Sequence, residues 1–444
     1  MKFVSTRNHS DSVSFTEAMF RGLAPDGGLY RPDSTPDLSA FFASLSDDVP
    51  FNELASGLTA ALLGPEISRE TSENIIRDAF DFTPELREVS GGMYVLELFH
   101  GPSCAFKDFG ASFLASSMNH LLAEKPGSVD SIDKSDRAII ITATSGDTGS
   151  AVARAFHGKD RIDVVILYPS GRVSPLQEKQ LTTLGGNVTA LEVDGSFDDC
   201  QRMAKAAFTD PALSNLPLSS ANSINLGRLI PQSFYYVWAW TRMRSIAADG
   251  NFAFIVPSGN FGNITAGLYA KTWGLPVNHY VAVTNANDVV PEYLKTGLYK
   301  PRPSQATCSN AMDVGDPSNF ERLDDLYESS VDVFRNHIEA YTVDDKTTLS
   351  TISRVKKNYD YLCCPHTAVG WRGAELYREK NPDIPAVILS TAHPGKFVEV
   401  VEEATGRPPE LPFALKELAD REKKAYPVGN KDTDLREWLL SRFS

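Results

Sequence analysis

Residues 252–263 have the sequence FAFIVPSGNFGN, in which five apolar residues run into a loop with two glycines. A short, wholly apolar run that ends in a turn is typical of a strand buried on both faces of a sheet. The residues that follow, Ile264 to Tyr269, predict the start of a helix. Residues 138–149 have the sequence AIIITATSGDTG and repeat this order. Repeated units of strand, loop and helix indicate an α/β fold with parallel strands and helical crossovers.

The same alternation extends in both directions from these two runs. We expect strands at 94–99, 138–142, 163–168, 187–193, 252–256, 279–284 and 386–390. We expect helices at 105–124, 148–157, 174–184, 197–208 and 226–247, with further amphipathic helix within 415–444. Residues 301–320 are polar and rich in Pro, Ser and Asn, so they predict a loop or an insertion. Because the pattern restarts after residue 222, the sequence predicts two α/β domains, at 93–222 and 223–444.

Residues 1–92 lack this alternation and predict a separate N-terminal domain. Apolar residues at helical spacing occur at 14–21, 51–63 and 71–80. Gly64-Pro65 is expected to end the second of these helices. The chain is therefore expected to have an N-terminal domain followed by two α/β domains.

The composition is that of an ordinary globular protein. The chain has 444 residues, of which 42% are hydrophobic and 23% are charged. Asp and Glu number 57 against 43 Lys and Arg, which gives a net charge of −14. This excess argues against proteins that wrap nucleic acid and against polybasic membrane binders. One local pocket can still bind an anionic small molecule.

The cysteines and the N-terminus predict a cytoplasmic protein without a metal site. There are 5 cysteines, and they form neither a CxxC pair nor a zinc-binding spacing with histidine. The N-terminus lacks the apolar core of a signal peptide, and no apolar run approaches the ~20 residues of a membrane span. The subunit count is open between a monomer and a homodimer.

Two loops at the ends of predicted strands are candidate anion sites, because ligands of α/β sheets bind beyond the carboxyl ends of the strands. In the loop at 257–263, two glycines expose backbone N–H groups next to a helix N-terminus, which suits a phosphate. This loop matches neither of the common nucleotide-binding motifs, and a plain turn capped by Asn263 is the alternative. The loop at 143–149 offers three hydroxyls and a carboxylate, and a capped turn is again the alternative.

Lys107 is a candidate nucleophile. It follows a predicted strand and a Gly-Pro turn, lies just inside a predicted helix, and is flanked by Phe106 and Phe109. The helix N-terminus and burial both disfavour its charged form, and the neutral amine is the form that makes a Schiff base. The alternative is a surface lysine whose stem covers the two phenylalanine rings.

Two further segments carry polar side chains that suit a ligand. Arg228 near Ser223 offers a guanidinium fork beside a hydroxyl, which suits phosphate, and a solvent-facing helix arginine is the alternative. Thr391 directly follows the predicted strand at 386–390, where a hydroxyl can reach a heterocycle, and a simple turn is the alternative.

Taken together, these segments resemble the threonine synthase family, in the longer branch found in many bacteria and fungi. The resemblance covers nearly the whole chain. It rests on motifs that occur in the family's order, at 3–8, 22–30, 96–102, 105–108, 144–149, 258–263 and 391–394. The resemblance implies the tryptophan-synthase-β type of pyridoxal phosphate (PLP) fold, called fold type II. Two α/β domains would surround the cofactor, and residues 1–92 would form the threonine synthase N-terminal domain.

The same resemblance implies a PLP-dependent carbon-oxygen lyase. It would convert O-phospho-L-homoserine and water to L-threonine and phosphate by γ-elimination and β-addition, the last step of threonine biosynthesis. Lys107 would be the catalytic residue and carry the cofactor as a Schiff base. The other implied cofactor-binding residues are Gly259, Asn260, Phe261, Gly262, Asn263 and Thr391. The implied substrate-binding residues are Thr144, Ser145, Asp147, Thr148, Ser223 and Arg228.

The chain departs from the family pattern at a few positions. Ser103 and Cys104 stand where a threonine and an apolar residue are expected, and Gly395 stands where alanine is expected. These changes leave the Lys107 assignment in place, and Cys104 is expected to pack as a small residue.

Three alternative functions stay open at this point. They are a related PLP phospho-lyase that releases 2-oxobutyrate, a serine/threonine dehydratase, and a cofactor-free binding protein that keeps the fold. Two segments disfavour the dehydratase. Residues 105–107 are Ala-Phe-Lys, where a dehydratase is expected to have Ser-Phe-Lys. Residues 145–147 are Ser-Gly-Asp, where it is expected to have Ser-x-Gly-Asn.

Overall fold

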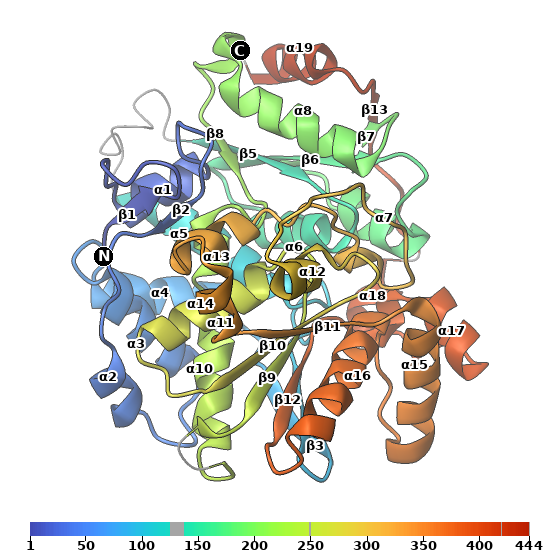
Figure 1. Cartoon of the computed structure of the whole chain (residues 1–444). Helices are drawn as coiled ribbons and strands as arrows, with labels where there is room; N and C mark the ends of the chain where they lie inside the picture. The colour runs from blue at the N-terminus through green and yellow to red at the C-terminus, as the bar shows by residue number, and fades with distance from the viewer. Residues whose placement is uncertain (125–136, 248–249, 419, 444) are drawn as a thin grey trace.

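The computed structural model describes residues 1–124, 137–247, 250–418 and 420–443. It contains two large sheets, one above the other in Figure 1, with helices packed on each. The predicted α/β class, with parallel strands joined by helices, is confirmed. Within the described ranges, no helix is long and apolar enough to cross a membrane. All five cysteines are free thiols.

The upper sheet in Figure 1 has five parallel strands in the order β13-β7-β6-β5-β8. These strands are β5 (Ala138–Ala143), β6 (Ile162–Pro169), β7 (Val188–Val193), β8 (Leu218–Ser220) and β13 (Tyr426–Val428). The helices between them are α6 (Asp147–Phe156), α7 (Pro175–Thr182) and α8 (Phe197–Thr209). The sequence did not predict β8 or β13, because three residues are too few to show a period.

The lower sheet has six strands in the order β11-β10-β9-β12-β4-β3, and only β3 runs antiparallel to its neighbour. The strands are β3 (Glu85–Ser90), β4 (Met93–Glu97), β9 (Ala253–Pro257), β10 (His279–Thr284), β11 (Glu339–Thr342) and β12 (Ala386–Ser390). Because β12 lies between β9 and β4, the carboxyl ends of these three parallel strands meet at one edge of the sheet. The three loops that follow them are therefore neighbours.

The strand pairing crosses the predicted domain boundaries. β4 lies in the predicted domain 93–222 but pairs with β12 from 223–444. β13 lies in the predicted domain 223–444 but pairs with β7. The division into 1–92, 93–222 and 223–444 stays a prediction.

The N-terminal segment packs directly on the rest of the chain. It contains a two-stranded antiparallel sheet of β1 (Phe3–Ser5) and β2 (Tyr30–Pro32). Its helices are α1 (Phe15–Arg21), α2 (Ser39–Ser44), α3 (Phe51–Leu63) and α4 (Arg69–Ala79). The hydroxyls of Ser14 and Ser68 accept N–H groups at the starts of α1 and α4. α3 packs on α10 and α4 packs on α5, so this segment shares its core with the later helices.

The predicted helices and strands begin and end within about two residues of those observed, with one exception. The single helix predicted at 226–247 is wrong. The structure has α9 (Leu226–Leu229) and α10 (Gln232–Met243), separated by Ile230 and Pro231. Proline has no N–H for the helical ladder and clashes with the preceding turn, so the first helix ends there.

The remaining helices are α5 (Lys107–Glu124), α11 (Gly262–Thr272), α12 (Val289–Thr296), α13 (Phe320–Leu326), α14 (Val331–Arg335), α15 (Asp345–Tyr359), α16 (Pro365–Lys380), α17 (Val398–Thr405), α18 (Phe413–Lys416) and α19 (Asp432–Phe443). Of these helices, α5, α11 and α19 were predicted, whereas α12 to α17 were not. The predicted loop at 301–320 contains one short 3-10 turn at Asn310–Met312. The tail predicted as amphipathic helix contains α19 and also β13, and its residues 419 and 444 lie outside the described residues.

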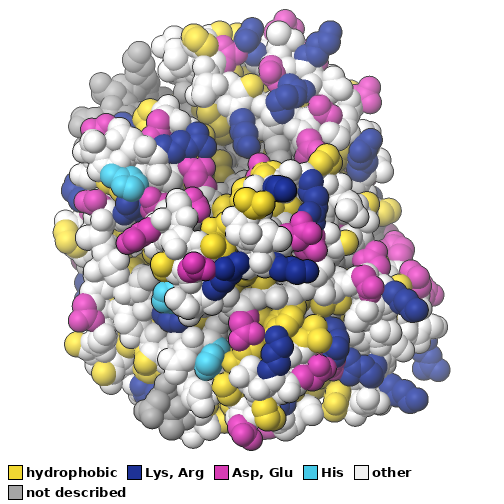
Figure 2. Space-filling model, viewed as in Figure 1, with side chains coloured by type: hydrophobic (Ala, Val, Ile, Leu, Met, Phe, Trp, Pro, Cys, Tyr) yellow, Lys and Arg dark blue, Asp and Glu magenta, His cyan; other side chains and the backbone are white. Residues whose placement is uncertain are grey.

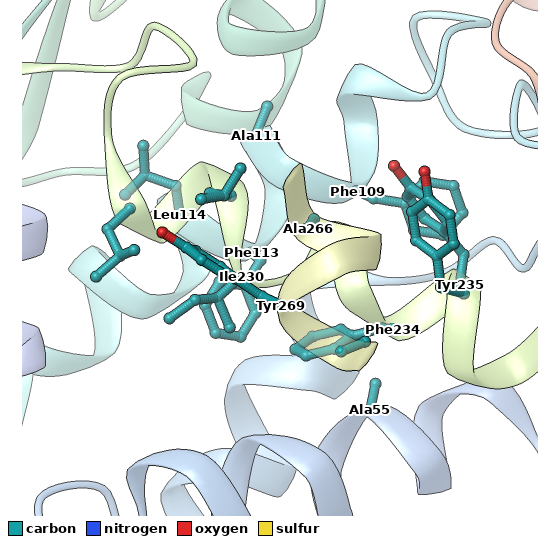
Figure 3. Packing of buried hydrophobic residues seen from close by; sticks show 14 of the residues in the cluster. Ala55, Phe109, Ala111, Phe113, Leu114, Ile230, Phe234, Tyr235, Ala266 and Tyr269 are labelled. Carbon is teal, nitrogen blue, oxygen red and sulfur yellow. The ribbon is translucent and has the colours of Figure 1, made fainter. Parts of the chain in front are cut away.

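Aromatic side chains from α5 and α10 form much of the core below the site. Figure 3 shows Phe109 beside Tyr235, and their ring centroids are 5.3 Å apart. Phe113 and Phe234 meet edge to face at 5.6 Å. In the same view Phe234 lies over Ala55 of α3. This packing holds α5, and with it Lys107 at its first position, against the rest of the molecule.

Candidate active site

A cavity of about 310 Å³ lies between the two sheets, where loops from the ends of their strands face each other. Cavities of this size hold small ligands and cofactors. All the site residues singled out in the sequence line it. They are Lys107, Thr144, Ser145, Asp147, Thr148, Ser223, Arg228, Gly259, Asn260, Phe261, Gly262, Asn263 and Thr391. Figure 2 shows basic and acidic side chains interspersed over this face of the molecule, so any anion selectivity arises from the residues inside the cavity.

Lys107 begins α5 and lies on the cavity wall. Lys107 is half-buried and is one of the residues that line the cavity. Its Nζ lies 5.9 Å from the centroid of the Phe106 ring, and no side chain of the described residues forms an ion pair with it. Burial lowers the pKa of Lys107 to about 8, Asp147 opposes this shift, and Arg228 and Lys396 reinforce it. The alternative of a lysine on the outer surface is therefore wrong.

The loop that leads to Lys107 is fastened to the loop after β12. Phe106 N–H donates to the Thr391 carbonyl at 2.8 Å, and His393 N–H donates to the Cys104 carbonyl at 3.0 Å. Cys104 has a left-handed backbone with φ of 57°, which this pair of contacts enforces. Burial raises the pKa of the Cys104 thiol to about 11, so it stays protonated at neutral pH. Cys104 therefore packs as a small side chain, as expected.

The loop at 258–263 brings backbone very close to its neighbours. A Cβ atom on Gly259 would lie 2.7 Å from Met312 Cα, so no other residue fits there. Phe261 has φ of 58° and turns the chain into α11. Asn263 accepts hydrogen bonds from the Tyr235 and Tyr236 hydroxyls, each at 2.8 Å, while its buried Nδ2 has no hydrogen-bond partner. The cavity wall thus offers an unused donor beside a helix N-terminus.

Ser223 and Arg228 supply the second group of donors. Asn260 Nδ2 donates to Ser223 Oγ at 2.5 Å, which ties Ser223 to the glycine loop. Arg228 Nη1 donates to the Ala221 carbonyl at 2.6 Å, and its buried Nε has no hydrogen-bond partner. Burial lowers the pKa of Arg228 to about 10, and the side chain remains a cation at neutral pH. Because Arg228 lines the cavity, its charge favours an anion there.

The loop at 144–149 is held by hydrogen bonds within it and across the cavity. Thr144 Oγ1 accepts the N–H groups of Gly146 and Gly149, at 3.0 and 2.9 Å. Asp147 Oδ1 lies 2.9 Å from Lys396 Nζ and 3.1 Å from Gln177 Nε2. Burial by itself raises the pKa of Asp147, but the charges of Lys396 and Lys107 together with the Lys396 hydrogen bond outweigh burial and hold that pKa well below its usual range.

Sequence reasoning missed three residues at this site. Lys396 is fully buried in the loop after β12, and no sequence rule separates a buried lysine from an exposed one. His366 lines the cavity at the start of α16, where its Nε2 accepts the Ala311 N–H at 3.2 Å. Burial lowers the pKa of His366 to about 4, so it is neutral. Arg302, from the predicted loop at 301–320, also lines the cavity and pairs with Glu292 at 2.8 Å.

Comparison with known proteins identifies the family. Residues 82–391 match the model of the pyridoxal-phosphate dependent enzymes. Residues 2–80 match the threonine synthase N terminus, and residues 367–438 match the threonine synthase C-terminal region. The chain is 42% identical to threonine synthase of Escherichia coli over 95% of both chains. It is 39% identical to that of Haemophilus influenzae over 99% of this chain and 100% of the relative.

The chain belongs to the threonine synthase family. Its structure superposes on crystal structures of threonine synthase from Escherichia coli, with a TM-score of 0.89, 39% identity and coverage of 99% and 100% of the two chains. It also superposes on PLP-bound threonine synthase from Brucella melitensis, with a TM-score of 0.90, 36% identity and 99% of both chains covered.

These findings decide several of the predictions. PLP fold type II, PLP as the cofactor, and a PLP-dependent lyase with threonine synthase activity are confirmed. A threonine deaminase of Solanum lycopersicum matches with a TM-score of 0.52 at 15% identity, which reflects the shared fold alone. The phospho-lyase, dehydratase and cofactor-free alternatives are not supported.

Proposed function

We propose that the chain converts O-phospho-L-homoserine and water to L-threonine and phosphate in the cavity between its two sheets. One observation carries this proposal. Lys107, whose amine has no ion-pair partner among the described side chains, lines the same 310 Å³ cavity as Arg228 and the glycine loop at 258–263. A site for this reaction needs one amine and two places for phosphate groups, and the cavity has donors for both.

The residues of the cavity fit PLP. We propose that the N–H groups of Gly259, Asn260, Phe261, Gly262 and Asn263 hold the cofactor phosphate, because they lie at the start of α11 in a loop that only glycine can form at residue 259. Lys107 is proposed to carry the cofactor. Thr391, at the end of β12, is proposed to hydrogen-bond the ring nitrogen. When bound, PLP supplies an aldehyde that links to amines and a ring that accepts electrons.

Lys107 is also proposed to move protons during the reaction. Its pKa of about 8 leaves a useful fraction of free amine near neutral pH, and a base works best when its pKa is near the working pH. The amine can accept the proton that leaves Cα of the substrate and return it later. His366 is neutral and its Nε2 is engaged by the Ala311 N–H, so it is not the base we propose.

Ser223 and Arg228 are proposed to bind the substrate phosphate. The phosphate leaves Cγ as a dianion, and a preorganised cation with oriented donors stabilises that developing charge. Arg228 is already desolvated and held by Ala221, so little reorganisation is needed. Ser223 is held through Asn260, which couples the substrate phosphate to the cofactor loop.

The loop at 144–149 is proposed to bind the rest of the substrate. Ser145 and Thr148 keep accessible surface, whereas Thr144 and Asp147 are buried. Because Thr144 and Asp147 are engaged by hydrogen bonds that shape the loop, Ser145 and Thr148 are the side chains free to reach a ligand. The N–H groups at the start of α6 add donors for a carboxylate.

Turnover of phosphohomoserine by the purified chain, with and without added PLP, tests the proposal. We expect release of phosphate together with an equal amount of threonine, and loss of both in Lys107→Ala. Lys205→Ala is the matched control, since Lys205 is exposed on α8. Release of phosphate with 2-oxobutyrate in place of threonine would contradict the proposed product. Absence of turnover in the PLP-loaded chain would contradict the proposed substrate.

We also propose the coarser features of the protein. Three domains at 1–92, 93–222 and 223–444 are proposed; the separate N-terminal match supports the first boundary, whereas β4 and β13 pair with strands across the second. A small-molecule substrate is supported by the cavity of about 310 Å³, and a cytoplasmic location by the free thiols. The assembly is proposed to be a monomer or a homodimer. Light scattering of the purified chain distinguishes the two assembly states.

A further inference from the structure

A buried ion pair joins three loops at the edge of the cavity. Lys396 Nζ lies 2.9 Å from Asp147 Oδ1, and the two side chains are 0% and 4% exposed. Lys396 Nζ also donates to the Ser103 carbonyl at 2.7 Å. Lys396 belongs to the loop after β12, Asp147 to the start of α6, and Ser103 to the loop that leads to Lys107. One ammonium therefore links the lower sheet, the upper sheet and the Lys107 loop.

Two lysines share the environment of one carboxylate. Asp147 is engaged by Lys396 and by Gln177, whose Nε2 donates to the same oxygen at 3.1 Å. Lys107 lies on the same cavity wall, yet within the described ranges no carboxylate lies at ion-pair distance from its amine. Asp108, next to it in sequence, instead accepts the Ser103 N–H at 2.9 Å.

We propose that Lys396 is a positioning residue that holds the Asp147 carboxylate and so leaves the amine of Lys107 unpaired. The inference rests on the proposed role of Lys107 and extends it to a residue that does not itself touch substrate. An amine in an ion pair is held protonated, and a protonated amine cannot attack a carbonyl group or accept a proton. Lys396 thus keeps Lys107 available for both tasks.

The charges around Lys107 support this assignment. The groups that act on its amine are Asp147, which favours the charged form, and Arg228 and Lys396, which disfavour it. Without the Lys396 charge, Lys107 loses one repulsive neighbour. At the same time Asp147 loses its partner, and a buried carboxylate without a partner takes the nearest cation available. Both changes favour the charged form of Lys107.

Competitive labelling of Lys107 tests the proposal without cofactor or substrate. The full-length chain freed of PLP is treated with trace acetic anhydride over the pH range of the amine's titration, and labelling of the Lys107 peptide is measured by mass spectrometry. We compare wild type, Lys396→Met, Lys396→Arg and the double variant Lys396→Met with Asp147→Asn. Lys205 provides an internal reference in every sample, since it is exposed.

We expect Lys396→Met to slow Lys107 labelling near neutral pH by about tenfold, which corresponds to about one pKa unit. Lys396→Arg should label like the wild type, because arginine keeps the charge. The double variant should return toward the wild type, because no carboxylate is left to pair with Lys107. In the holoenzyme, the Lys107 amine is free only after the substrate amine has displaced it, so the rising limb of kcat with pH should move to higher pH in Lys396→Met and recover in Lys396→Arg.

Unchanged Lys107 labelling in Lys396→Met, or a shift that persists in the double variant, would overturn the proposal. If Lys396→Met does not fold, the single variant Asp147→Asn tests the proposal instead. It should speed the labelling of Lys107. Slower or unchanged labelling of Lys107 in Asp147→Asn would contradict the proposal. The labelling needs no turnover. It therefore separates a failure of this inference from a failure of the proposed function, which would appear as a wild-type enzyme that makes no threonine.

Discussion

Two regions of the molecule each contain a fully desolvated arginine. One region is the cavity wall, and the other is the junction between the N-terminal segment and the rest of the chain. At the junction, Arg322 donates to the carbonyls of Tyr30 at 2.9 Å and Ile224 at 2.6 Å, and to Asn319 Oδ1 at 2.6 Å. On the cavity wall, Arg228 donates only to Ala221, and its Nε stays without a partner. Burial lowers the pKa of both arginines to about 10.

The difference between the two regions lies in the donors that are left over. The junction uses its cation to hold backbone carbonyls from distant segments, so the energetic cost of burial is offset inside the protein. On the cavity wall, Arg228 Nε and Asn263 Nδ2 are buried without a hydrogen-bond partner, and the Lys107 amine has no ion-pair partner among the described side chains. We therefore expect Arg322 to maintain structure and Arg228 to bind an anion. Substitutions in the two regions should therefore separate activity from stability.

The largest expected effect is that of Lys107→Ala on the cavity wall. We expect kcat to fall by at least about 1000-fold, because the proposed base is lost. The unfolding temperature should stay the same or rise, since the amine has no ion-pair partner among the described side chains. Kinetics of the PLP-loaded proteins measure the first effect, and thermal unfolding of the cofactor-free proteins measures the second. A large loss of stability in Lys107→Ala would break the contrast between the regions.

Arg228→Met is expected to lower kcat/KM by about 100-fold, the usual effect of removing one preorganised donor from a developing negative charge. Stability should change little, because Arg228 makes one side-chain hydrogen bond. The exposed Arg407→Met is the matched control. Steady-state kinetics with phosphohomoserine measure the effect. An unfolding midpoint that falls as far as that of Arg322→Met would show that Arg228 is also structural.

Arg322→Met tests the junction, and here the loss should appear in stability. The substitution leaves four acceptors without the Arg322 donor, and two of the four hydrogen bonds are buried; we expect a cost of about 3 kcal/mol in the free energy of unfolding. Urea unfolding measures this cost. Activity per folded molecule should fall less than in Arg228→Met, since Arg322 acts on the site only through the backbone at 223–224. A normal urea midpoint would contradict the assigned role.

The smallest expected effect concerns pH. The pKa of Lys107 in the folded, cofactor-free chain is lowered from 10.5 to about 8, so the unfolded chain binds more protons between these values. The free energy of unfolding should therefore rise with pH between about 8 and 10.5, by roughly 1 kcal/mol per pH unit. Below about pH 8 this rise is absent. Urea unfolding of wild type and Lys107→Met at several pH values measures the slope. Equal slopes in the two proteins would show that the amine is not desolvated.

Much of the site could be predicted because its residues stand at the ends of apolar runs. The loops after β5, β9 and β12 carry Thr144, Gly259 and Thr391, and a buried parallel strand places the residues that follow it at the ligand-binding edge of its sheet. Pro231 was visible in the sequence as well, yet the periodicity of 226–247 led to a single helix. The local effect of the proline prevailed over the apolar pattern.

The sequence by itself determined the α/β class, the order of the elements and the loops that carry the chemistry, because these depend on local periodicity and on residues close together in the chain. Only the tertiary structure decided that Lys396 pairs with Asp147, that His366 is neutral, and that Arg228 keeps a free donor while Arg322 does not. Pairing, burial and pKa depend on contacts between residues distant in sequence. Those contacts exist only once the strands are ordered in their sheets, which brings the loops after β4, β5 and β12 together.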